Sequence, residues 1–415
     1  MKTLAVIAEY NPFHNGHKYH LEQSLKVTGA DYAITIMSGN FLQRGTTAIA
    51  DKFTRTSLAL RGGVDLVLEL PFPYATGSAM DFSMGAISIL NKLQSVDYLC
   101  FGAENPDLET FYKVSDVILS EPDSYRSSLK NHLASGNSYP LARSKALEEY
   151  FKDFSLGEFV SSPNNILGIE YVTALRRLGS NIIPVPIKRV CAGYHDTNLY
   201  GNISSASAIR EHFTSSATPT LKSIKKDIPE DDYEILSQKY QQLWPIYDSE
   251  LTPFLQSTLL REMDFTEICD INQDFSNKLK ALSKNCSYQE ALEQLKSKDL
   301  TLTRVSRNLI HLLLDYKKAD RDAFVSKGYA LYANILGLRK ESSSLLKNIN
   351  TNSSIPVINK KADFYNTISA YNQDTDIAKL MWKLDLKATD LYNCLIYNKY
   401  GTFCANDYST PVVIL

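Results

Sequence analysis

The sequence predicts an α/β protein whose first half forms a doubly wound parallel sheet and whose second half carries an appended, mostly helical domain. In residues 1–213, short apolar runs alternate with helical patterns, which is the spacing that parallel sheets require. From about Thr214 the strand patterns fade, and leucine, lysine and serine recur at helical spacing. We therefore expect an α/β domain at 1–213, a mostly helical domain at 214–350 and a segment at 351–415 that packs on the rest.

The individual elements follow from these runs. Strands are predicted at residues 3–8, 32–37, 65–70, 97–101 and 181–187. Helices are predicted at residues 17–27, 51–61, 78–93, 108–119 and 165–178, and further along at 288–295 and 306–316. Ligands bind where the strands of such sheets end, so the loops that begin at Glu9, Ser38, Gly102 and Lys188 should share one crevice.

Composition limits the class of protein. The chain has 415 residues, 44% of them hydrophobic and 22% charged, with a net charge of −2, which excludes disordered, collagen-like and coiled-coil proteins. Its six cysteines are scattered without a C-x-x-C pair, which argues against a disulfide framework and a zinc ribbon. No apolar run approaches about 18 residues, so we expect a cytoplasmic protein without a membrane partner.

The strongest local pattern is the loop that follows the first strand, residues 9–17 (EYNPFHNGH). The loop lies between a predicted strand and a predicted helix, and at such a position backbone N–H groups and the helix dipole bind phosphate. His14 and His17 are three residues apart, and Gly16 between them lets the backbone approach a triphosphate closely. Their imidazoles can donate hydrogen bonds that stabilise charge growing on an α-phosphate under attack. This pattern favours nucleotide binding.

Other interpretations of the two histidines exist. They could be surface or capping residues, or two ligands of a metal ion. The strand–loop–helix context favours the nucleotide over both. The chain contains neither a G-x-x-x-x-G-K-[ST] loop nor a G-x-G-x-x-G motif after a strand, so a P-loop enzyme and a dinucleotide redox enzyme have no support.

The loop resembles the HxGH signature of the nucleotidyltransferase superfamily, whose members attack the α-phosphate of ATP and release pyrophosphate. Residues 203–210 (ISSASAIR) resemble the same superfamily's I-S-S-T-x-I-R motif, with one residue more between its serines and its arginine. Ser204 or Ser205 can cap the following helix, and Arg210 can bind the outer phosphates. An ordinary helix cap with a surface arginine is the alternative.

A closer resemblance is to the bacterial tRNA(Met) cytidine acetate ligases. The motifs that carry it are residues 8–17 (AEYNPFHNGH), 37–45 (MSGNFLQRG), 51–55 (DKFTR), 69–71 (ELP), 101–104 (FGAE), 162–168 (SPNNILG), 187–189 (IKR) and 303–307 (TRVSR). The resemblance implies a Rossmann-like nucleotidyltransferase domain with a helical RNA-binding region. It also implies that ATP and acetate form acetyl-adenylate and pyrophosphate, and that the acetyl group then passes to N4 of the wobble cytidine of elongator tRNA(Met), with release of AMP.

The family motifs indicate which residues form the ATP site. The catalytic residues would be His14, His17 and Asp51. The ATP-binding residues would be Ile7, Ala8, Glu9, Tyr10, Asn11, Pro12, Phe13, His14, Asn15, Gly16, His17, Lys18, Tyr19, His20, Gly102, Asn165, Lys188, Arg189, Ser204, Ser205 and Arg210. ATP would arrive with Mg²⁺, for which the sequence identifies no ligands.

Alternatives stay open for the residues outside the first loop. Gly102 could simply end a strand, Asn165 could cap a helix, and Lys188 with Arg189 could be solvated surface residues. Gln43, Arg44, Asp51, Lys52 and Arg55 are expected to flank the acetate and cytidine side. Asp51 could accept a proton from the cytidine amine, or it could pair with Arg55 four residues later on a helix.

The helical domain is locally basic. Residues 276–347 contain 14 Lys and Arg against 7 Asp and Glu, an excess of +7 that the total charge conceals. Arg304, Arg307, Lys317 and Lys318, with Arg321 close by, would contact the tRNA backbone, although solvated helix surfaces have similar composition.

Two other functions are compatible with parts of the sequence. An adenylyltransferase for a small phosphorylated metabolite would need only the HxGH and serine motifs, and a non-catalytic RNA-binding protein could retain them as a relic. The added basic domain argues against the former, and intact His14, Gly16 and His17 argue against the latter. Nothing in the sequence indicates an acetyltransferase that uses acetyl-CoA.

Overall fold

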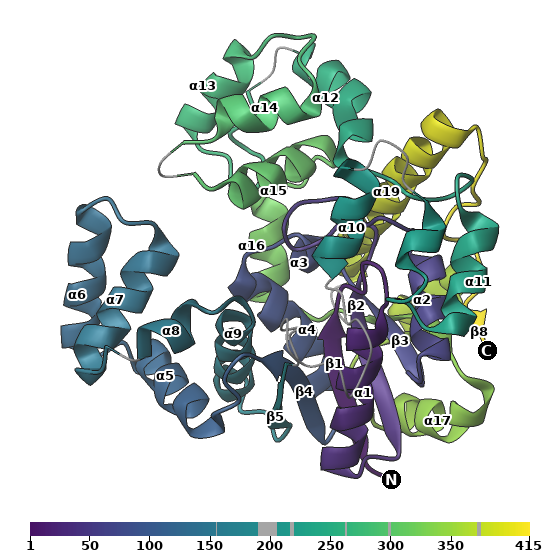
Figure 1. Cartoon of the computed structure of the whole chain (residues 1–415), viewed down its shortest axis with the longest axis horizontal. Coiled ribbons are helices and arrows are strands. Elements are labelled where there is room, and N and C mark those ends of the chain that lie inside the picture. Colours follow the sequence, from purple (N-terminus) through teal and green to yellow (C-terminus); the bar gives the residue numbers. More distant parts are fainter. Residues whose placement is uncertain (155, 190–205, 216–219, 262–263, 298–299, 372–374) are drawn as a thin grey trace.

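A computed structural model of the whole chain describes residues 1–154, 156–189, 206–215, 220–261, 264–297, 300–371 and 375–415. Its centre is a mostly parallel sheet with helices on both faces (Figure 1). The strands are β1 (Thr3–Ala8), β2 (Tyr32–Ser38), β3 (Leu66–Leu70), β4 (Tyr98–Ala103), β5 (Ile183–Lys188), β6 (Ala333–Leu338), β7 (Val357–Ile358) and β8 (Val413–Ile414). All five strands predicted in the first half are confirmed.

The strand order in the described chain is β5-β4-β1-β2-β3-β6-β7, with β8 paired to β6. Neighbours from β5 to β3 are parallel, as the alternating pattern predicts, and β6 pairs antiparallel with β3. The three strands from residues 333–338, 357–358 and 413–414 were not predicted. A six-residue apolar run such as ANILGL has no periodicity that separates a buried strand from part of a helix.

Helices pack on both faces because side chains alternate along each buried strand. Leu4 and Val6 of β1 belong to the core on one face, and Ala5 belongs to the core on the other. The helices of the first half are α1 (Asn15–Thr28), α2 (Lys52–Arg61), α3 (Phe72–Ala75), α4 (Ala79–Leu93), α5 (Leu108–Ser120), α6 (Asp123–Ala134), α7 (Tyr139–Phe151), α8 (Leu156–Ser161), α9 (Pro163–Arg177) and α10 (Ala206–Ser215). The helices α6 to α8, which the sequence analysis did not predict, project from one edge of the sheet (Figure 1).

The second half is mostly helical, as predicted. Its helices are α11 (Glu230–Lys239), α12 (Thr252–Leu259), α13 (Gln273–Ala281), α14 (Tyr288–Leu295), α15 (Leu302–Leu313), α16 (Lys318–Ser326), α17 (Ser343–Asn352), α18 (Phe364–Ala370) and α19 (Thr375–Tyr400). Short 3-10 helices occur at Leu221–Ile224, Asp248–Leu251, Lys340–Ser342 and Lys361–Asp363. The helices α12 to α15 form a lobe above the sheet (Figure 1). None of the described helices is both long and apolar enough to cross a membrane.

All three predicted segments contribute to the sheet, because β6 lies within 214–350 and β7 and β8 lie within 351–415. The lobe also contacts the first half directly. Ser306 on α15 donates a hydrogen bond to the Gly45 carbonyl at 2.7 Å, and a Cβ atom on Gly45 would lie 2.3 Å from the Arg307 amide nitrogen. Gly45 has a φ of 75°, so this close backbone approach needs glycine for two reasons. The boundaries 213/214 and 350/351 therefore remain proposals about segments that pack together.

Arg55 joins the ends of the first two strands. Its buried guanidinium donates to the carbonyls of Glu9 at 2.7 Å and Ser38 at 3.0 Å, and also to the carbonyls of Gly39 and Ala50. Each buried carbonyl that loses its hydrogen-bond donor lowers the free energy of unfolding by about 1–3 kcal/mol. These bonds fix the points at which the chain leaves β1 and β2.

Replacing Arg55 by lysine tests this contribution. Arg55→Lys keeps the charge but cannot reach all four carbonyls, and we expect the free energy of unfolding to fall by about 3 kcal/mol. Arg61→Lys, at the exposed end of the same helix, is the matched control and should change it by less than about 0.5 kcal/mol. Urea unfolding followed by tryptophan fluorescence measures both, and equal transition midpoints for the two variants would contradict the assignment.

Candidate functional site

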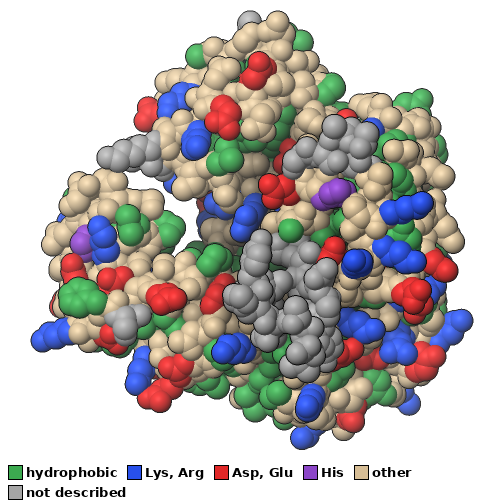
Figure 2. All heavy atoms as spheres, in the orientation of Figure 1, with side chains coloured by type: hydrophobic (Ala, Val, Ile, Leu, Met, Phe, Trp, Pro, Cys, Tyr) green, Lys and Arg blue, Asp and Glu red, His purple; other side chains and the backbone are tan. Residues whose placement is uncertain are grey.

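A cavity of about 970 Å³ lies at the carboxyl ends of β1, β4 and β5. The residues that line it are Val6, Ile7, Ala8, Glu9, Tyr10, Asn11, His14, Gly16, His17, Tyr19, His20, Gln43, Arg44, Ala79, Phe82, Phe101, Gly102, Pro163, Asn164, Ile166, Leu167, Tyr171, Lys188, Arg189, Ala206, Ala208 and Arg210. The loops that follow β1, β2 and β5 contribute, and β4 contributes Phe101 and Gly102 near its end, so the predicted shared crevice is confirmed. The molecular surface is hollowed between the lobe of α6 and α7 and the lobe of α12 to α15 (Figure 2).

Side chains from distant parts of the chain fix the loop after β1. Asn11 is buried, and its side-chain oxygen accepts a hydrogen bond from the Ile49 amide at 2.7 Å. Its carbonyl accepts from Arg210 at 2.7 Å, which brings α10 against the loop. The next residues are tied to the segment before α11, because the Asn15 backbone amide donates to the Asp227 carbonyl. Together with Arg55, these bonds hold the loop rigid from Glu9 to Asn15.

His14 caps the first helix and keeps one ring nitrogen for a ligand. Its Nδ1 accepts a hydrogen bond from the Gly16 amide at 3.0 Å, so in the neutral ring the hydrogen is on Nε2. Burial, reinforced by the charges of Arg189 and Arg210, lowers the pKa of His14 to about 4. His14 is therefore a neutral hydrogen-bond donor at physiological pH, which is the state that can bind a phosphate oxygen without taking up a proton.

His17 and His20 continue the same face of α1. The rings of His14 and His17 lie 3.8 Å apart between centroids. Burial lowers the pKa of His17 well below its ordinary value and that of His20 to about 4. Nδ1 of His17 and Nε2 of His20 are buried with no hydrogen-bond partner among the described residues. Unsatisfied buried polar atoms on a cavity wall are expected where a ligand completes the hydrogen bonding.

The charges around the cavity are mostly positive. Arg44, Lys188, Arg189 and Arg210 line it, and among the described lining residues the carboxylates are limited to Glu9. Glu9 is itself held in place, since its Oε1 accepts a hydrogen bond from the Gln43 amide at 2.9 Å. Arg189 and Arg210 are held by hydrogen bonds to Asn164 and Asn11, and such cations beside neutral imidazoles suit a polyphosphate.

A hydrogen-bonded network connects the loop after β4, the start of α9 and Arg189. Asn164 donates to Glu104 at 2.6 Å through its side chain, and its oxygen accepts from Arg189 at 3.1 Å. Asn165 is fully buried, and its oxygen accepts from the amides of Glu104 and Asn105. Asn165 therefore shapes the loop after β4, while its neighbours Pro163, Asn164 and Ile166 line the cavity.

Gly102, near the end of β4, also lines the cavity. A Cβ atom at Gly102 would lie 3.1 Å from Cγ of Arg189, so any side chain here would compete with Arg189 for space at the cavity. The glycine thus leaves backbone without a side chain beside a cation at the cavity.

The structure separates the predicted ATP-site residues into two groups. Those that line the cavity are Ile7, Ala8, Glu9, Tyr10, Asn11, His14, Gly16, His17, Tyr19, His20, Gly102, Lys188, Arg189 and Arg210. Those that do not line it are Pro12, Phe13, Asn15, Lys18 and Asn165. Phe13 is fully buried against Gly62, and the side chain of Lys18 is exposed. Ser204 and Ser205 lie outside the described residues.

Asp51 and its neighbours on α2 have mainly structural contacts. Asp51 is the N-cap of α2 and accepts hydrogen bonds from the amides of Phe53 and Thr54, both at 2.9 Å. It does not line the cavity, and Arg55 bonds to backbone carbonyls, as described above, instead of forming an ion pair with it. Lys52 is buried and bonds to Glu69. Gln43 and Arg44, from the same predicted group, do line the cavity.

Several lining residues were not predicted individually. Tyr171 and Leu167 come from α9, and Ala79 and Phe82 come from the start of α4. The motif at residues 162–168 indicated that α9 belongs to the site. Nothing in the spacing of α4 distinguishes Phe82 from an ordinary core residue, because it is also buried in the main core.

The predicted tRNA-binding residues are mostly engaged within the protein. Lys318 donates to the carbonyls of Thr266 and Ile271, both at 2.8 Å, and Lys317 pairs with Glu267 at 3.3 Å. Arg307 packs behind Gly45, whereas Arg304 on the same helix is exposed. Arg321 forms an ion pair with Asp81 at 2.8 Å. Arg304 is thus the member of this group best placed to contact a partner.

The HIGH nucleotidyl transferase family matches residues 1–406. The chain is 38% identical to the tRNA(Met) cytidine acetate ligase of Acetivibrio thermocellus over 422 residues, and 37% identical to that of a Thermoanaerobacter species over 417 residues. Both alignments cover all of each chain.

Solved structures agree with these relatives. The crystal structure of Thermotoga maritima TmcAL bound with alpha-thio ATP superposes with a TM-score of 0.91 at 32% identity, covering all of both chains. The apo form of the same protein gives the same values. The resemblance thus includes the helical lobe and the C-terminal segment as well as the sheet.

The burial of the histidines makes a prediction about pH. Burial lowers the pKa of His14 to about 4 and that of His17 well below its ordinary value, so the ring resonances of both should not shift between about pH 5.5 and 8, where an ordinary histidine titrates. Nuclear magnetic resonance of the chain with labelled histidine measures this, with His14→Gln and His17→Gln used for assignment. A midpoint near pH 6.5 for either ring would show that the site is more solvated than described.

Proposed function

The chain belongs to the HIGH nucleotidyl transferase family and, within it, to the tRNA(Met) cytidine acetate ligases, and from this membership we propose that it is an ATP-dependent ligase that acetylates the wobble cytidine of elongator tRNA(Met). The observation that carries the proposal is the cavity in which neutral His14 and His17 face the cationic Arg189 and Arg210. A relative with the same fold, matched over the whole of both chains, was crystallised with alpha-thio ATP. The products would be N4-acetylcytidine, AMP and pyrophosphate.

The proposed reaction has two steps. In the first, a carboxylate oxygen of acetate attacks the α-phosphorus of ATP, and the bond from that phosphorus to pyrophosphate breaks, which leaves acetyl-adenylate. In the second, N4 of the cytidine attacks the acetyl carbon, the bond from that carbon to AMP breaks, and N4 loses a proton. Both steps build negative charge on phosphate oxygens, so fixed donors and cations accelerate them.

The residues of the cavity have different roles in these steps. We assign His14 and His17 to the phosphate oxygens, where Nε2–H of His14 and the neutral ring of His17 can donate without a proton transfer. Lys188, Arg189 and Arg210 would bind the outer phosphates and stabilise departing pyrophosphate. Mg²⁺ would arrive on ATP, and since Glu9 is the sole carboxylate among the described lining residues, phosphate oxygens and water would be most of its ligands.

The acetate side is assigned to the loop after β2 and the start of α4. Gln43 and Arg44 offer polar groups there, and Ala79 and Phe82 offer an apolar wall suited to a methyl group. Arg44 is exposed, so its guanidinium can bind the carboxylate of acetate as it enters or the RNA backbone that follows. Asp51 is retained as a candidate for positioning the cytidine amine, although its two amide contacts already give it a structural role.

Two competing functions are less well supported. An adenylyltransferase for a small phosphorylated metabolite would share the cavity, but the similarity to acetate ligases extends through the helical lobe to the C-terminal segment. An enzyme that takes its acetyl group from acetyl-CoA would not need the phosphate-binding residues. Acetyl-CoA supplied without ATP should therefore give no acetylated tRNA.

Replacing one phosphate donor tests the proposed function. His17→Ala should lower acetate-dependent exchange of labelled pyrophosphate into ATP by about 100-fold or more, because a transition-state donor is lost. His132→Ala, on the projecting helix α6, is the control and should exchange at the wild-type rate. Thermal unfolding and tRNA binding of both variants should match the wild type. If His17→Ala exchanged pyrophosphate at the wild-type rate, His17 would have no catalytic role.

A charge reversal tests the RNA surface. Arg304→Glu should weaken tRNA binding roughly tenfold at low salt. It should also reduce the slope of log affinity against log salt concentration by about 1, as expected for the loss of one phosphate contact, while pyrophosphate exchange stays unchanged. Lys347→Glu, an exposed residue on α17 far from the lobe, is the matched control. Equal affinities for the two variants would exclude Arg304 from the tRNA interface.

A further inference from the structure

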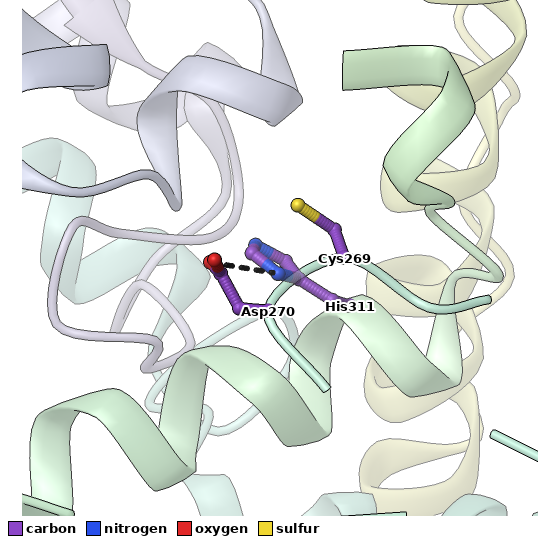
Figure 3. Close-up of side chains that lie close together, drawn as sticks. All are labelled: Cys269, Asp270 and His311. Atoms are coloured by element: carbon purple, nitrogen blue, oxygen red, sulfur yellow. Dashed lines mark ion pairs between the residues drawn. The ribbon is translucent and has the colours of Figure 1, made fainter. Parts of the chain in front are cut away.

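Three potential metal ligands lie together outside the ATP cavity, at the junction between the helical lobe and the sheet (Figure 3). They are Cys269 and Asp270, which precede α13, and His311 of α15. Their ligand atoms, Sγ, a carboxylate oxygen and a ring nitrogen, all lie within 4.8 Å of one another. Thiolate, carboxylate and imidazole are the three ligand types that zinc combines most often.

Hydrogen bonding determines which nitrogen of His311 is free. Its Nε2 lies 3.2 Å from the carbonyl oxygen of Thr76 and also 3.2 Å from the Thr76 hydroxyl. A carbonyl only accepts, so Nε2 carries the hydrogen. The side chain is 1% exposed, which favours the neutral ring and leaves the lone pair on Nδ1. A ring nitrogen that donates to a backbone carbonyl while the other is free is the usual arrangement of a metal-binding histidine.

The free nitrogen faces another acceptor. Nδ1 of His311 has no hydrogen-bond partner among the described residues, and it lies 3.9 Å from Oδ2 of Asp270 (Figure 3). Two acceptors that face each other without a hydrogen between them are unfavourable in a buried place. The side-chain oxygen of Asn308, one turn earlier on α15, is also buried without a described partner. A cation at this position would satisfy the facing acceptors.

The backbone around the three side chains is already fixed. The Cys269 amide donates to the Tyr316 carbonyl at 2.8 Å, and the Asn308 side chain donates to the Asp270 carbonyl at 3.2 Å. Lys318 holds the carbonyls on either side of the pair, as described above. The ligands are therefore brought together by the fold and would need only side-chain adjustment to reach a tetrahedral ion with bonds of about 2.0–2.3 Å.

We propose that Cys269, Asp270 and His311 form a site for a divalent ion of the zinc class, bound through Sγ, a carboxylate oxygen and Nδ1. The side chain of Asp270 is 42% exposed, so the ion can enter from solvent and water can supply the fourth ligand. Binding releases the thiol proton of Cys269 to solvent. The thiolate and the carboxylate then balance the two positive charges of the ion.

The charges nearby affect the affinity. Arg307 lies close enough to His311 to act on it, and Arg321 lies close enough to Cys269. The charge of Arg321 is neutralised by its ion pair with Asp81. Arg307 is therefore the main opposing charge among the described residues, and we expect its replacement by methionine to strengthen metal binding.

The site would stabilise the junction between the lobe and the sheet. His311 contacts Thr76 from the lobe side, and the neighbouring Gly77 carbonyl accepts a hydrogen bond from the cavity residue Gln43 at 3.5 Å. An ion on Nδ1 makes the opposite N–H a stronger donor to Thr76. This role is independent of the chemistry proposed for the ATP cavity.

Titration with Co²⁺ of the full chain, stripped of metal with a chelator, tests the proposal. A thiolate bound to cobalt gives a charge-transfer absorption in the near ultraviolet, and we expect it to saturate at one equivalent. Cys269→Ser should abolish the band, and Asp270→Asn should weaken binding at least tenfold. Cys394→Ser, an exposed cysteine on α19, is the matched control and should keep the band.

A second readout distinguishes this site from the histidines of the ATP cavity. Zn²⁺ should raise the unfolding temperature of the wild type and of His17→Ala equally, and that of Asp270→Asn by less. Three results would overturn the proposal: no thiolate band in the wild type, a band that survives in Cys269→Ser, or metal binding that is lost only in His17→Ala.

Discussion

The guanidinium of Arg55 is the interaction on which the geometry of the ATP cavity depends most. It is fully buried, and backbone carbonyls at the ends of β1 and β2 replace the water that would otherwise solvate it. Because strands that end in register place their loops side by side, fixing Glu9 and Ser38 also fixes where the His14 loop and the Gln43 loop begin. The two loops then form adjacent walls of one cavity.

A second buried network connects the sheet to the end of the chain. Lys52 lies 2.8 Å from Glu69 and 2.8 Å from Asp407, and Lys361 lies 3.3 Å from the other oxygen of Asp407. Removing one partner of such a network leaves a buried charge uncompensated, at a cost of about 3–5 kcal/mol. Glu69 also explains why residue 39 is a glycine, because a Cβ atom there would lie 2.6 Å from a carboxylate oxygen of Glu69. The C-terminal segment is therefore part of the support of the ATP cavity, although it contributes none of its described lining residues.

The sequence predicted the parts of the molecule that depend on local patterns. Buried parallel strands such as β1 are continuous apolar runs, and the His14–His17 loop needs a strand before it and a helix after it, so both could be recognised. Side-chain partners far apart in sequence could not. Asn165, proposed as a nucleotide ligand, also supports the loop after β4 through its side-chain oxygen, and Lys317 and Lys318, proposed to contact RNA, also bind the segment before α13. A charge count along a helix does not reveal which charges the fold itself uses.

The central claim is that the energy of ATP drives transfer of free acetate to tRNA. The most direct measurement supplies isotopically labelled acetate, ATP and bacterial tRNA to the purified chain, digests the RNA and analyses its nucleosides by mass spectrometry. The account predicts labelled N4-acetylcytidine from tRNA(Met) when ATP is present, one AMP released for each acetyl group transferred, and no product without ATP. Labelled acetylcytidine formed without ATP, or ATP cleaved with acetate while every nucleoside stays unlabelled, would contradict it.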